Sequence, residues 1–329
     1  MGNCECSPKA AKSKQSLNSS PILNEQSVHI PQMHPKVHAL AEKVFKEQMS
    51  SVANIDLADK SLGEECGKYL AAILPYYSHA SELNLDNCQL LEGSCEVIAT
   101  SLIDMISLKE LNLSRNRIGD KAADILSLSL SKLTKLEKLM LENIGIGTES
   151  VILISTSLLT LINLKELNLS QNRLGNQGAR ALANTFSYIP KLELLDIHNT
   201  EIGAKGAAFI GFEIYKLTKL KVLNIGENKL FSSGISAIIS SLPKSIQILN
   251  FEQTGLDSHC LSESCEYLSR LSSLTDLYLD RNNISSEGSA SIIRILSSLN
   301  LKYLGLLGCD VSQQRQEITL ASMSTEIYL

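Results

Sequence analysis

The sequence predicts an α/β solenoid, a horseshoe with a parallel β-sheet on its inner side and helices on its outer side. One observation is a segment that occurs twice: residues 108–119 read LKELNLSRNRIG, and residues 164–175, which start 56 positions later, read LKELNLSQNRLG. The other is a set of aliphatic columns that recur about every 28 residues along most of the chain. Self-similarity at a fixed spacing is the sequence signature of stacked repeats.

Each repeat is predicted to contain one strand and one helix. The L-x-L piece has the alternation of a strand, and the stretch after it, such as residues 175–186, has apolar residues at helical spacing. A single strand–helix unit cannot bury its apolar face, whereas stacked units can, and the wider helices make the stack curve with its strands inside. About ten repeats follow from the anchor residues, which are Ile55, Leu83, Leu111, Leu139, Leu167, Leu195, Leu223, Leu249, Leu277 and Leu304.

An asparagine column explains why the two copies lie 56 residues apart. Five positions after the anchor, Asn116 and Asn172 alternate with Ile144 and Thr200, and the alternation continues to Asn282. An Asn at this point can both donate to and accept from the backbone where the chain leaves the strand. Other residues must form the same turn differently, so the true period is predicted to be two repeats.

The pattern L-x-x-L-x-L-x-x-N/C-x-L in units of 28 residues resembles the leucine-rich repeats of the ribonuclease-inhibitor subfamily. That subfamily also includes NOD-like receptors and the Ran GTPase-activating protein. The resemblance covers about residues 52–311 and implies a leucine-rich-repeat domain over residues 51–312. It specifies the fold rather than the function, because this fold serves many roles.

Both ends of an open stack need a cover. Residues 34–50 are predicted to contain a capping helix, because Pro35 suits a first helical position and Val37, Leu40 and Val44 fall on one helical face. Residues 313–329 lose the repeat pattern and are interpreted as a C-terminal cap or tail.

Residues 1–33 are polar and without periodicity, and they are predicted to be a disordered tail. The tail begins MGNCECSPKAAKSK, in which Gly2 is a candidate for N-myristoylation and Cys4 and Cys6 are candidates for palmitoylation. The myristoylation motif asks for Ser or Thr where Cys6 stands, so the match is imperfect. A second acyl chain would make the attachment to a membrane stable. The alternative is an ordinary disordered leader with two incidental cysteines.

Composition and charge limit the kinds of protein that this chain can be and the compartment in which it is found. The net charge of −5 argues against a general nucleic-acid binder, which carries a basic excess. No apolar run is long enough to span a bilayer. The eight Cys form no disulfide framework in a chain of 329 residues, which favours a reducing compartment. The protein is therefore expected to be cytoplasmic, with any membrane attachment peripheral and on the cytoplasmic face.

Motifs for catalysis or for a bound cofactor are missing from the sequence. The chain has no G-x-S-x-G, no G-x-x-x-x-G-K-[ST] and no H-E-x-x-H. Zinc needs paired ligands such as C-x-x-C, which does not occur. Asp196 and His198 share one strand face without an evident nucleophile, which favours a surface hydrogen bond over half of a catalytic triad. The chain is predicted to be non-enzymatic, with no cofactor and no metal.

The inner face of the predicted sheet concentrates negative charge. Side chains one before, and one, three and four after each anchor include twelve acids but only three bases, Arg115, Lys138 and Arg281. A concave acidic wall attracts an oppositely charged partner, although exposed strand faces also need polar residues of some kind. The residues predicted to contact a partner are Glu82, Asp86, Glu110, Glu142, Glu166, Asp196 and Tyr278.

Two functions fit this sequence. The first is a monomeric, non-enzymatic adaptor that binds a protein with a basic surface on its concave face and is held at a membrane by N-terminal lipid. The second, implied by the resemblance, is a GTPase activator similar to the Ran activator. That family ends in a strongly acidic tail, whereas residues 312–329 contain only Glu317 and Glu326 as acids, which favours the adaptor.

Overall fold

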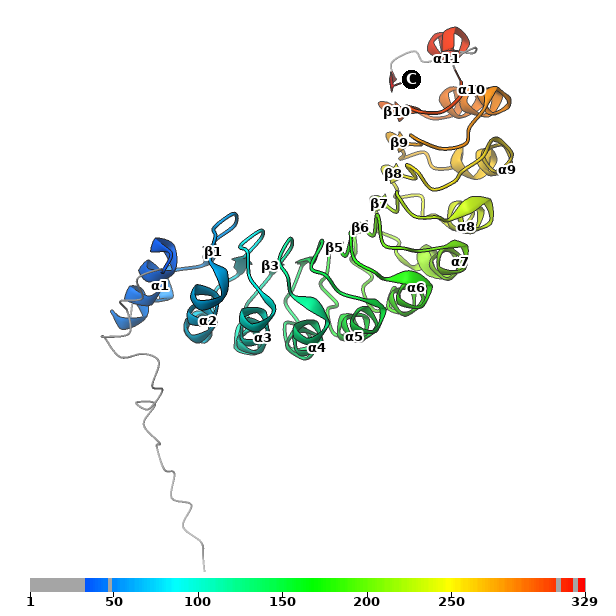
Figure 1. The fold of residues 1–329 in the computed structure, drawn as a ribbon. Coiled ribbons are helices and arrows are strands. Elements are labelled where there is room, and N and C mark those ends of the chain that lie inside the picture. Colours follow the sequence, from blue (N-terminus) through cyan, green and yellow to red (C-terminus); the bar gives the residue numbers. More distant parts are fainter. Residues whose placement is uncertain (1–32, 47–48, 312–314, 322–324, 329) are drawn as a thin grey trace, which may run out of the picture.

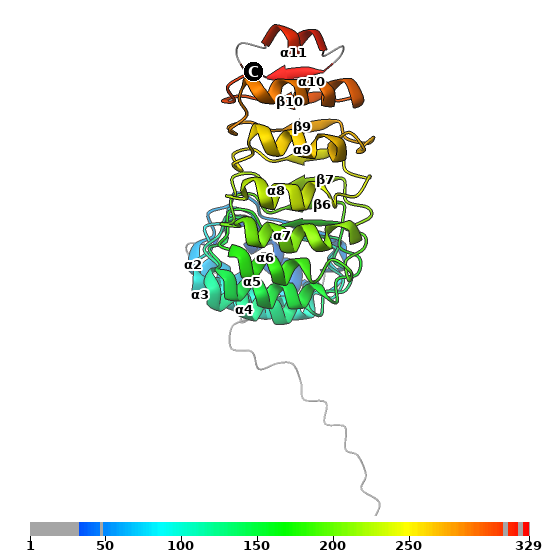
Figure 2. The same cartoon turned by 90° about the vertical axis from the view of Figure 1, so that its right-hand side faces the viewer.

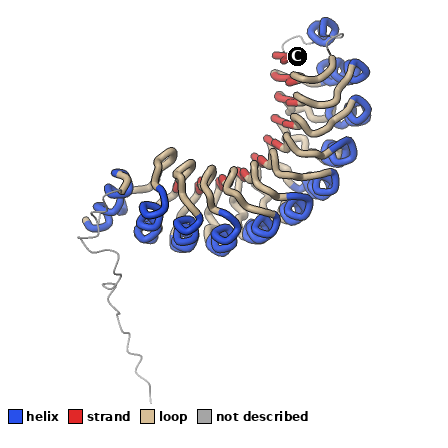
Figure 3. Tube along the Cα trace, viewed as in Figure 1, coloured by secondary structure: helices blue, strands red, loops and turns tan. Residues whose placement is uncertain are grey.

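The computed structural model of this chain describes residues 33–46, 49–311, 315–321 and 325–328. These residues form an open arc of stacked repeats, with strands along the concave side and helices along the convex side (Figure 1, Figure 3). The eleven strands of this part of the chain form one sheet and follow each other in sequence order, and every neighbouring pair is parallel. The prediction of an α/β solenoid with an inner parallel sheet is confirmed.

Each strand is three residues long and is centred on the anchor of its repeat. The strands are β1 (Asn54–Asp56), β2 (Glu82–Asn84), β3 (Glu110–Asn112), β4 (Lys138–Met140), β5 (Glu166–Asn168), β6 (Leu194–Asp196), β7 (Val222–Asn224), β8 (Ile248–Asn250), β9 (Asp276–Tyr278), β10 (Tyr303–Gly305) and β11 (Glu326–Tyr328).

The helices follow the strands in regular alternation and lie side by side on the outside of the arc (Figure 2). The α-helices are α1 (Pro35–Phe45), α2 (Gly63–Ile73), α3 (Glu92–Ser101), α4 (Gly119–Leu130), α5 (Thr148–Leu158), α6 (Gly175–Ala183), α7 (Ala204–Glu213), α8 (Phe231–Ile239), α9 (Ser258–Leu268), α10 (Ser289–Ser298) and α11 (Arg315–Ala321). Short 3-10 helices are η2 (Met49–Ser51), η3 (Leu74–Tyr77), η4 (Leu102–Asp104), η5 (Ile214–Lys216) and η6 (Ser286–Gly288).

The strand register aligns the anchor residues across the whole sheet. Ile55 pairs with Leu83, Leu83 pairs with Leu111, and the same register continues to Leu304. Successive residues of a strand point to opposite faces of a sheet. The buried anchors therefore face the helices, and the residues on either side of each anchor face the concave surface.

One continuous aliphatic core lies between the sheet and the helices. The anchors from Leu83 to Leu249 are fully buried, and each such leucine contributes about 2 kcal/mol of hydrophobic stabilisation. Tyr77, Phe186 and Phe251 are the largest of the fully buried side chains. Each repeat packs on its neighbours alone, so the stability of the arc is a sum of repeat and neighbour terms.

Buried asparagines join neighbouring repeats in pairs. The amide oxygen of Asn172 accepts from the N–H of Ile144 at 3.1 Å, and its Nδ2 donates to the carbonyl of Leu141 at 2.7 Å, both in the preceding repeat. Nδ2 also donates to the carbonyl of Leu169 in its own repeat. Because one Asn bonds the backbone of two repeats, an Asn in every second repeat is enough. This is the physical reason for the two-repeat period. Equivalent bonds are made by Asn116, Asn228 and Asn282.

Helix α1 closes the N-terminal end of the core. Val37 and Ala41 on its inner face are fully buried, and the hydroxyl of Tyr77 donates to the carbonyl of Leu40 at 2.7 Å. The helix occupies 35–45 of the segment 34–50 in which the sequence predicts it.

The C-terminal end adds an element that the repeat pattern does not predict. Helix α11 buries Ile318, and β11 then pairs in parallel with β10, Ile327 standing opposite Leu304. The segment predicted only as a cap or tail thus contributes an eleventh strand. Its residues lack the leucine spacing of the repeats, so the aliphatic columns gave no signal for it.

Candidate protein-binding surface

Two rows of side chains cover the concave side of the sheet. We call the residue before each anchor the first row and the residue after it the second row. The first row changes along the arc from charged, through apolar, to mixed acidic and aromatic. In strand order it consists of Asn54, Glu82, Glu110, Lys138, Glu166, Leu194, Val222, Ile248, Asp276, Tyr303 and Glu326.

The predicted contact residues Glu82 and Glu110 lie next to each other in the first row, on β2 and β3. Together with Lys138 they line a depression of about 120 Å³ across β2, β3 and β4. Lys138 forms an ion pair with Glu166, the Nζ–Oε2 distance being 3.0 Å. Neither Glu82 nor Glu110 has an ion-pair partner among the residues that the structure describes. These two carboxylates are therefore available to a cation from outside the chain.

Three other acids on this face are already engaged. Asp86 receives a two-point contact from the guanidinium of Arg115, and Arg281 Nη1 lies 3.4 Å from Glu252 Oε1. Glu142 Oε1 accepts from the side chain of Gln171 at 3.0 Å. Arg115, Lys138 and Arg281 thus each pair with an acid of the same face, which reduces the negative charge presented to a partner.

The predicted Asp196–His198 pair is present at the centre of the arc. The Nδ1 atom of His198 lies 2.8 Å from Asp196 Oδ1, and Asn224 Nδ2 donates to Asp196 Oδ2 at 3.0 Å. The hydrogen bond from Asp196 raises the pKa of His198 above its ordinary value, against the opposing effect of burial. The ring contacts the side chains of Asp196, Gln171 and Asn224, and these hydrogen-bond partners include no Ser, Thr or Cys.

The middle of the first row is apolar. Leu194, Val222 and Ile248 are half-buried and stand in register on β6, β7 and β8. The predicted acidic face did not include this stripe, although three successive aliphatic residues before the anchor were the signal for it. Half-buried aliphatic side chains between polar neighbours are suited to contact with a partner side chain.

Tyr278, predicted as a contact residue, is the first ring of an aromatic ladder at the C-terminal end of the face. Its ring centroid lies 4.5 Å from that of Tyr303, which lies 5.2 Å from that of Tyr328. Gly305 stands between Tyr278 and Tyr328 in the second row, and a Cβ there would come within 2.0 Å of Asp280 Oδ2. The glycine therefore admits the Asp280 carboxylate. Sequence reasoning missed Tyr303 and Tyr328 because the ladder switches rows between strands.

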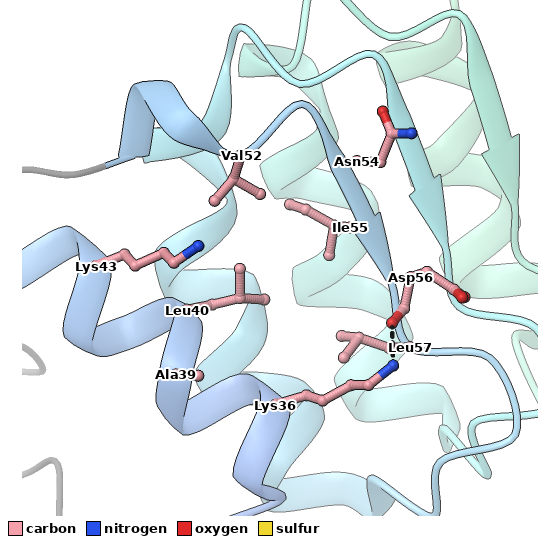
Figure 4. Close-up of a pocket in the computed structure, with 9 residues that line it drawn as sticks. All are labelled: Lys36, Ala39, Leu40, Lys43, Val52, Asn54, Ile55, Asp56 and Leu57. Carbon is pink, nitrogen blue, oxygen red and sulfur yellow. Dashed lines mark hydrogen bonds between the residues drawn. The ribbon is translucent and has the colours of Figure 1, made fainter.

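A pocket of about 300 Å³ lies between α1 and β1 (Figure 4). Leu40, Val52 and Leu57 are among its apolar walls, and Lys36 Nζ donates to the carbonyl of Asp56 at 3.0 Å across it. It is the seam between the capping helix and the first strand.

Five of the six cysteines among the described residues are core residues. Cys66, Cys88, Cys95, Cys260 and Cys265 are buried and free of disulfides. Burial raises the pKa of Cys88 and of Cys95 to about 12, so both thiols stay protonated and unreactive at neutral pH. Within the described residues no three His, Cys, Asp or Glu side chains gather as metal ligands would.

The acylation candidates Gly2, Cys4 and Cys6 lie outside the described residues. Among the residues that the structure does describe, no helix has the length and apolar character needed to cross a bilayer.

Comparison with known proteins is consistent with this architecture. The profile of the family described as Leucine Rich repeat matches residues 105–127 and 160–183, which lie in alternate repeats. No curated protein sequence matches the chain.

Solved structures share the fold at low sequence identity. The functional domain of InlJ from Listeria monocytogenes is 16% identical, with a TM-score of 0.50, over 80% of this chain and 46% of that one. The Arabidopsis receptor kinase HAESA, solved with the peptide hormone IDA and the co-receptor SERK1, is 18% identical, with a TM-score of 0.53, over 79% of this chain and 39% of that one. This chain therefore spans less than half the length of either. By its fold and its repeats, the chain described here is a leucine-rich-repeat solenoid.

Proposed function

We propose that this protein is a non-enzymatic adaptor that binds the basic surface of a partner protein on its concave face. The observation that carries the proposal is the pair Glu82 and Glu110, which are adjacent in register and form no ion pair with any residue that the structure describes. A concave wall focuses the field of such carboxylates on a cation approaching from solution. The apolar stripe at Leu194, Val222 and Ile248 supplies contact area beside the charge.

The remaining predicted contacts fit a binding site that runs along the arc. Glu166, Glu142 and Asp196 follow the two free carboxylates toward the centre, and Tyr278 begins the aromatic end. Asp86 is assigned a weaker role, since Arg115 already neutralises it. Support for a protein ligand also comes from HAESA, which has the same fold and is solved with a peptide hormone and a co-receptor.

Charge reversal at the two free carboxylates tests the binding site. The double variant E82K/E110K is expected to lower the affinity for a captured partner at least about tenfold and to flatten its dependence on salt. The matched control E149K/E287K changes the net charge equally at two exposed acids on the helical side. If both variants bind the partner as the unmodified protein does, the concave site is wrong.

We further propose that the adaptor is a monomer in the cytoplasm, tethered to a membrane by acyl groups on Gly2, Cys4 and Cys6. Support comes from the MGNCEC start, in which two cysteines follow Gly2 within four residues and offer sites for a second acyl chain. Mass spectrometry of the native N-terminus, compared with a Gly2→Ala variant, tests the tether. The repeat length and the alternating Asn support membership of the ribonuclease-inhibitor subfamily. That resemblance also implies the alternative function of a GTPase activator. Single-turnover GTP hydrolysis with candidate GTPases separates the adaptor from such an activator.

A further inference from the structure

The turns that join each helix to the next strand line up along one flank of the arc, because the helices of successive repeats run side by side (Figure 2). We call this flank the helix-to-strand edge. From η4 to β10 it contains eleven Lys and Arg but only three acids. The turns on the opposite flank, from β1 to residue 311, contain six Lys and Arg and nine acids. The helix-to-strand edge consists of residues 102–109, 131–137, 159–165, 184–193, 214–221, 240–247, 269–275 and 299–302.

Most of the positive charge on the helix-to-strand edge is not neutralised internally. Lys165 pairs with Glu137 at 2.5 Å and Lys221 with Glu193 at 2.7 Å. Lys216 and Arg270 pair with acids of the adjoining helices. The other cations of this edge have no ion-pair partner within the described part of the chain. They are Lys109, Lys132, Lys135, Lys191, Lys219, Lys244 and Lys302.

Apolar side chains protrude from the same edge. Ile106 and Ile162, at equivalent places in repeats 56 residues apart, are 55% and 56% exposed, and Tyr188 and Tyr215 are exposed to a similar degree. Single exposed apolar residues are normal on a protein surface. Here, however, they gather on the flank that also carries the free lysines.

The two kinds of side chain are intermixed along the edge. The turn before β3 presents Ile106 beside Lys109, and the turn before β4 presents Lys132 and Lys135. The turns before β6 and β7 each combine an exposed tyrosine with lysine.

We propose that the helix-to-strand edge docks on an anionic lipid bilayer. A flank built from successive turns of stacked repeats presents its tips as a row, which suits a flat target. Lysines near such a surface are attracted by anionic headgroups, and isolated Ile and Tyr side chains enter the interfacial region. A protein with an acidic surface fits less well, because the apolar tips are spread singly over several repeats.

This docking goes beyond the concave-face proposal and requires neither a partner protein nor acylation of Gly2. When this edge docks, the concave face stands roughly perpendicular to the bilayer and stays open to the cytoplasm. The two proposals therefore use different surfaces and fail independently.

Vesicle flotation of the full-length Gly2→Ala protein tests the docking without any contribution from myristate. The protein is expected to bind vesicles of phosphatidylcholine and phosphatidylserine at least about tenfold more strongly than vesicles of phosphatidylcholine alone. The variant K132E/K135E/K191E is expected to lose at least about tenfold of that binding. The matched control R117E/R173E/K229E makes the same change in net charge on the opposite flank and is expected to stay within about threefold.

A second variant separates insertion from charge. I106S/I162S keeps every lysine and is expected to weaken binding at least about threefold, with an unchanged circular dichroism spectrum to show that the fold persists. Equal binding to both kinds of vesicle, or equal losses in the two charge-reversal variants, would overturn the proposal. Binding to soluble polyglutamate without binding to vesicles would also overturn it, and would indicate an acidic protein as the partner of this edge.

Discussion

At the scale of single residues, the buried asparagines have the clearest energetic role. Asn172 is 3% exposed and makes bonds to the backbones of two repeats. An apolar residue in its place would leave buried N–H and C=O groups without partners, and such groups are costly in a core that excludes water.

Replacement of this side chain gives a stability prediction. Asn172→Ala is expected to lower the free energy of unfolding by about 3 kcal/mol, because several buried backbone groups lose their partner at once. Urea denaturation measures the loss. The control Asn184→Ala removes an exposed amide at the end of α6 and is expected to cost less than about 0.5 kcal/mol. Equal losses in the two variants would show that the buried bonds contribute little.

His198 gives a prediction about pH. Its pKa is raised by Asp196, so the pair adds stability that is fully present below the unfolded-state pKa of histidine and is lost as pH rises through the higher folded-state pKa. Asp196→Asn is expected to lower the pKa of His198 and to remove this pH-dependent part of the stability. NMR titration of the imidazole is the measurement, and an unchanged titration curve in the variant would contradict the assignment.

At the scale of the element, the turn after each of these strands requires one residue in the left-handed backbone conformation. The position four after the anchor has a φ between 49° and 58° in nine repeats and is Gly308, with φ 78°, in the tenth. Residues other than glycine and asparagine occupy this region at some cost in energy, which the bonds of the turn must offset. In β-strand order the nine residues are Asp59, Asn87, Arg115, Asn143, Gln171, Asn199, Glu227, Gln253 and Arg281.

A pair of substitutions at one turn measures this cost. Gln171 has a φ of 58°, and its side chain bonds Glu142. Gln171→Val is expected to destabilise the protein by about 1–2 kcal/mol, because a β-branched residue is strained at positive φ. Gln171→Asn loses the same contact with Glu142 but tolerates the conformation, so its thermal unfolding is expected to stay near that of the unmodified protein. Similar losses in both variants would assign the effect to the lost contact instead.

The parts of the fold that the sequence predicts are those that depend on burial. Aliphatic columns such as Leu83, Leu111 and Leu139 repeat because each must enter the same core, and their spacing therefore gives both the strands and the register. Strand β11 escaped prediction because Ile327, although it pairs with β10 and packs against the core, does not follow the spacing of the leucine columns.

The candidate site was predicted less completely. The aliphatic columns place Glu82, Glu110 and Tyr278 on the concave face, because alternate residues of a strand point to opposite faces of the sheet. It cannot show that Arg115 neutralises Asp86, because that contact joins residues 29 apart whose side-chain conformations are chosen by local packing. The Tyr278–Tyr303–Tyr328 ladder was missed for the same reason, as it joins different rows of successive strands.

At the scale of the whole molecule, stacking makes stability depend on position along the arc. A central repeat has two neighbours, whereas the last strand at each end has one. Repeat arrays of this kind open from their ends.

Hydrogen exchange followed by mass spectrometry tests this gradient. Amides of β5, β6 and β7 are expected to exchange at least about tenfold more slowly than those of β1 and β11, because local opening costs less free energy where one neighbour is missing. Uniform protection from β1 to β11 would instead mean that the arc unfolds as a single cooperative unit.

The pairing of Asn172 with Ile144 also sets the step by which such a chain can be lengthened or shortened. Excision of residues 117–172 would place Asn116 one repeat before Thr200. Repeats that contain the buried Asn would then still alternate with repeats whose turns that Asn bonds. Excision of residues 145–172 would instead set Ile144 beside Thr200, with no amide to receive the N–H of Ile144. Duplication and loss in a protein of this design are therefore expected to proceed by twos.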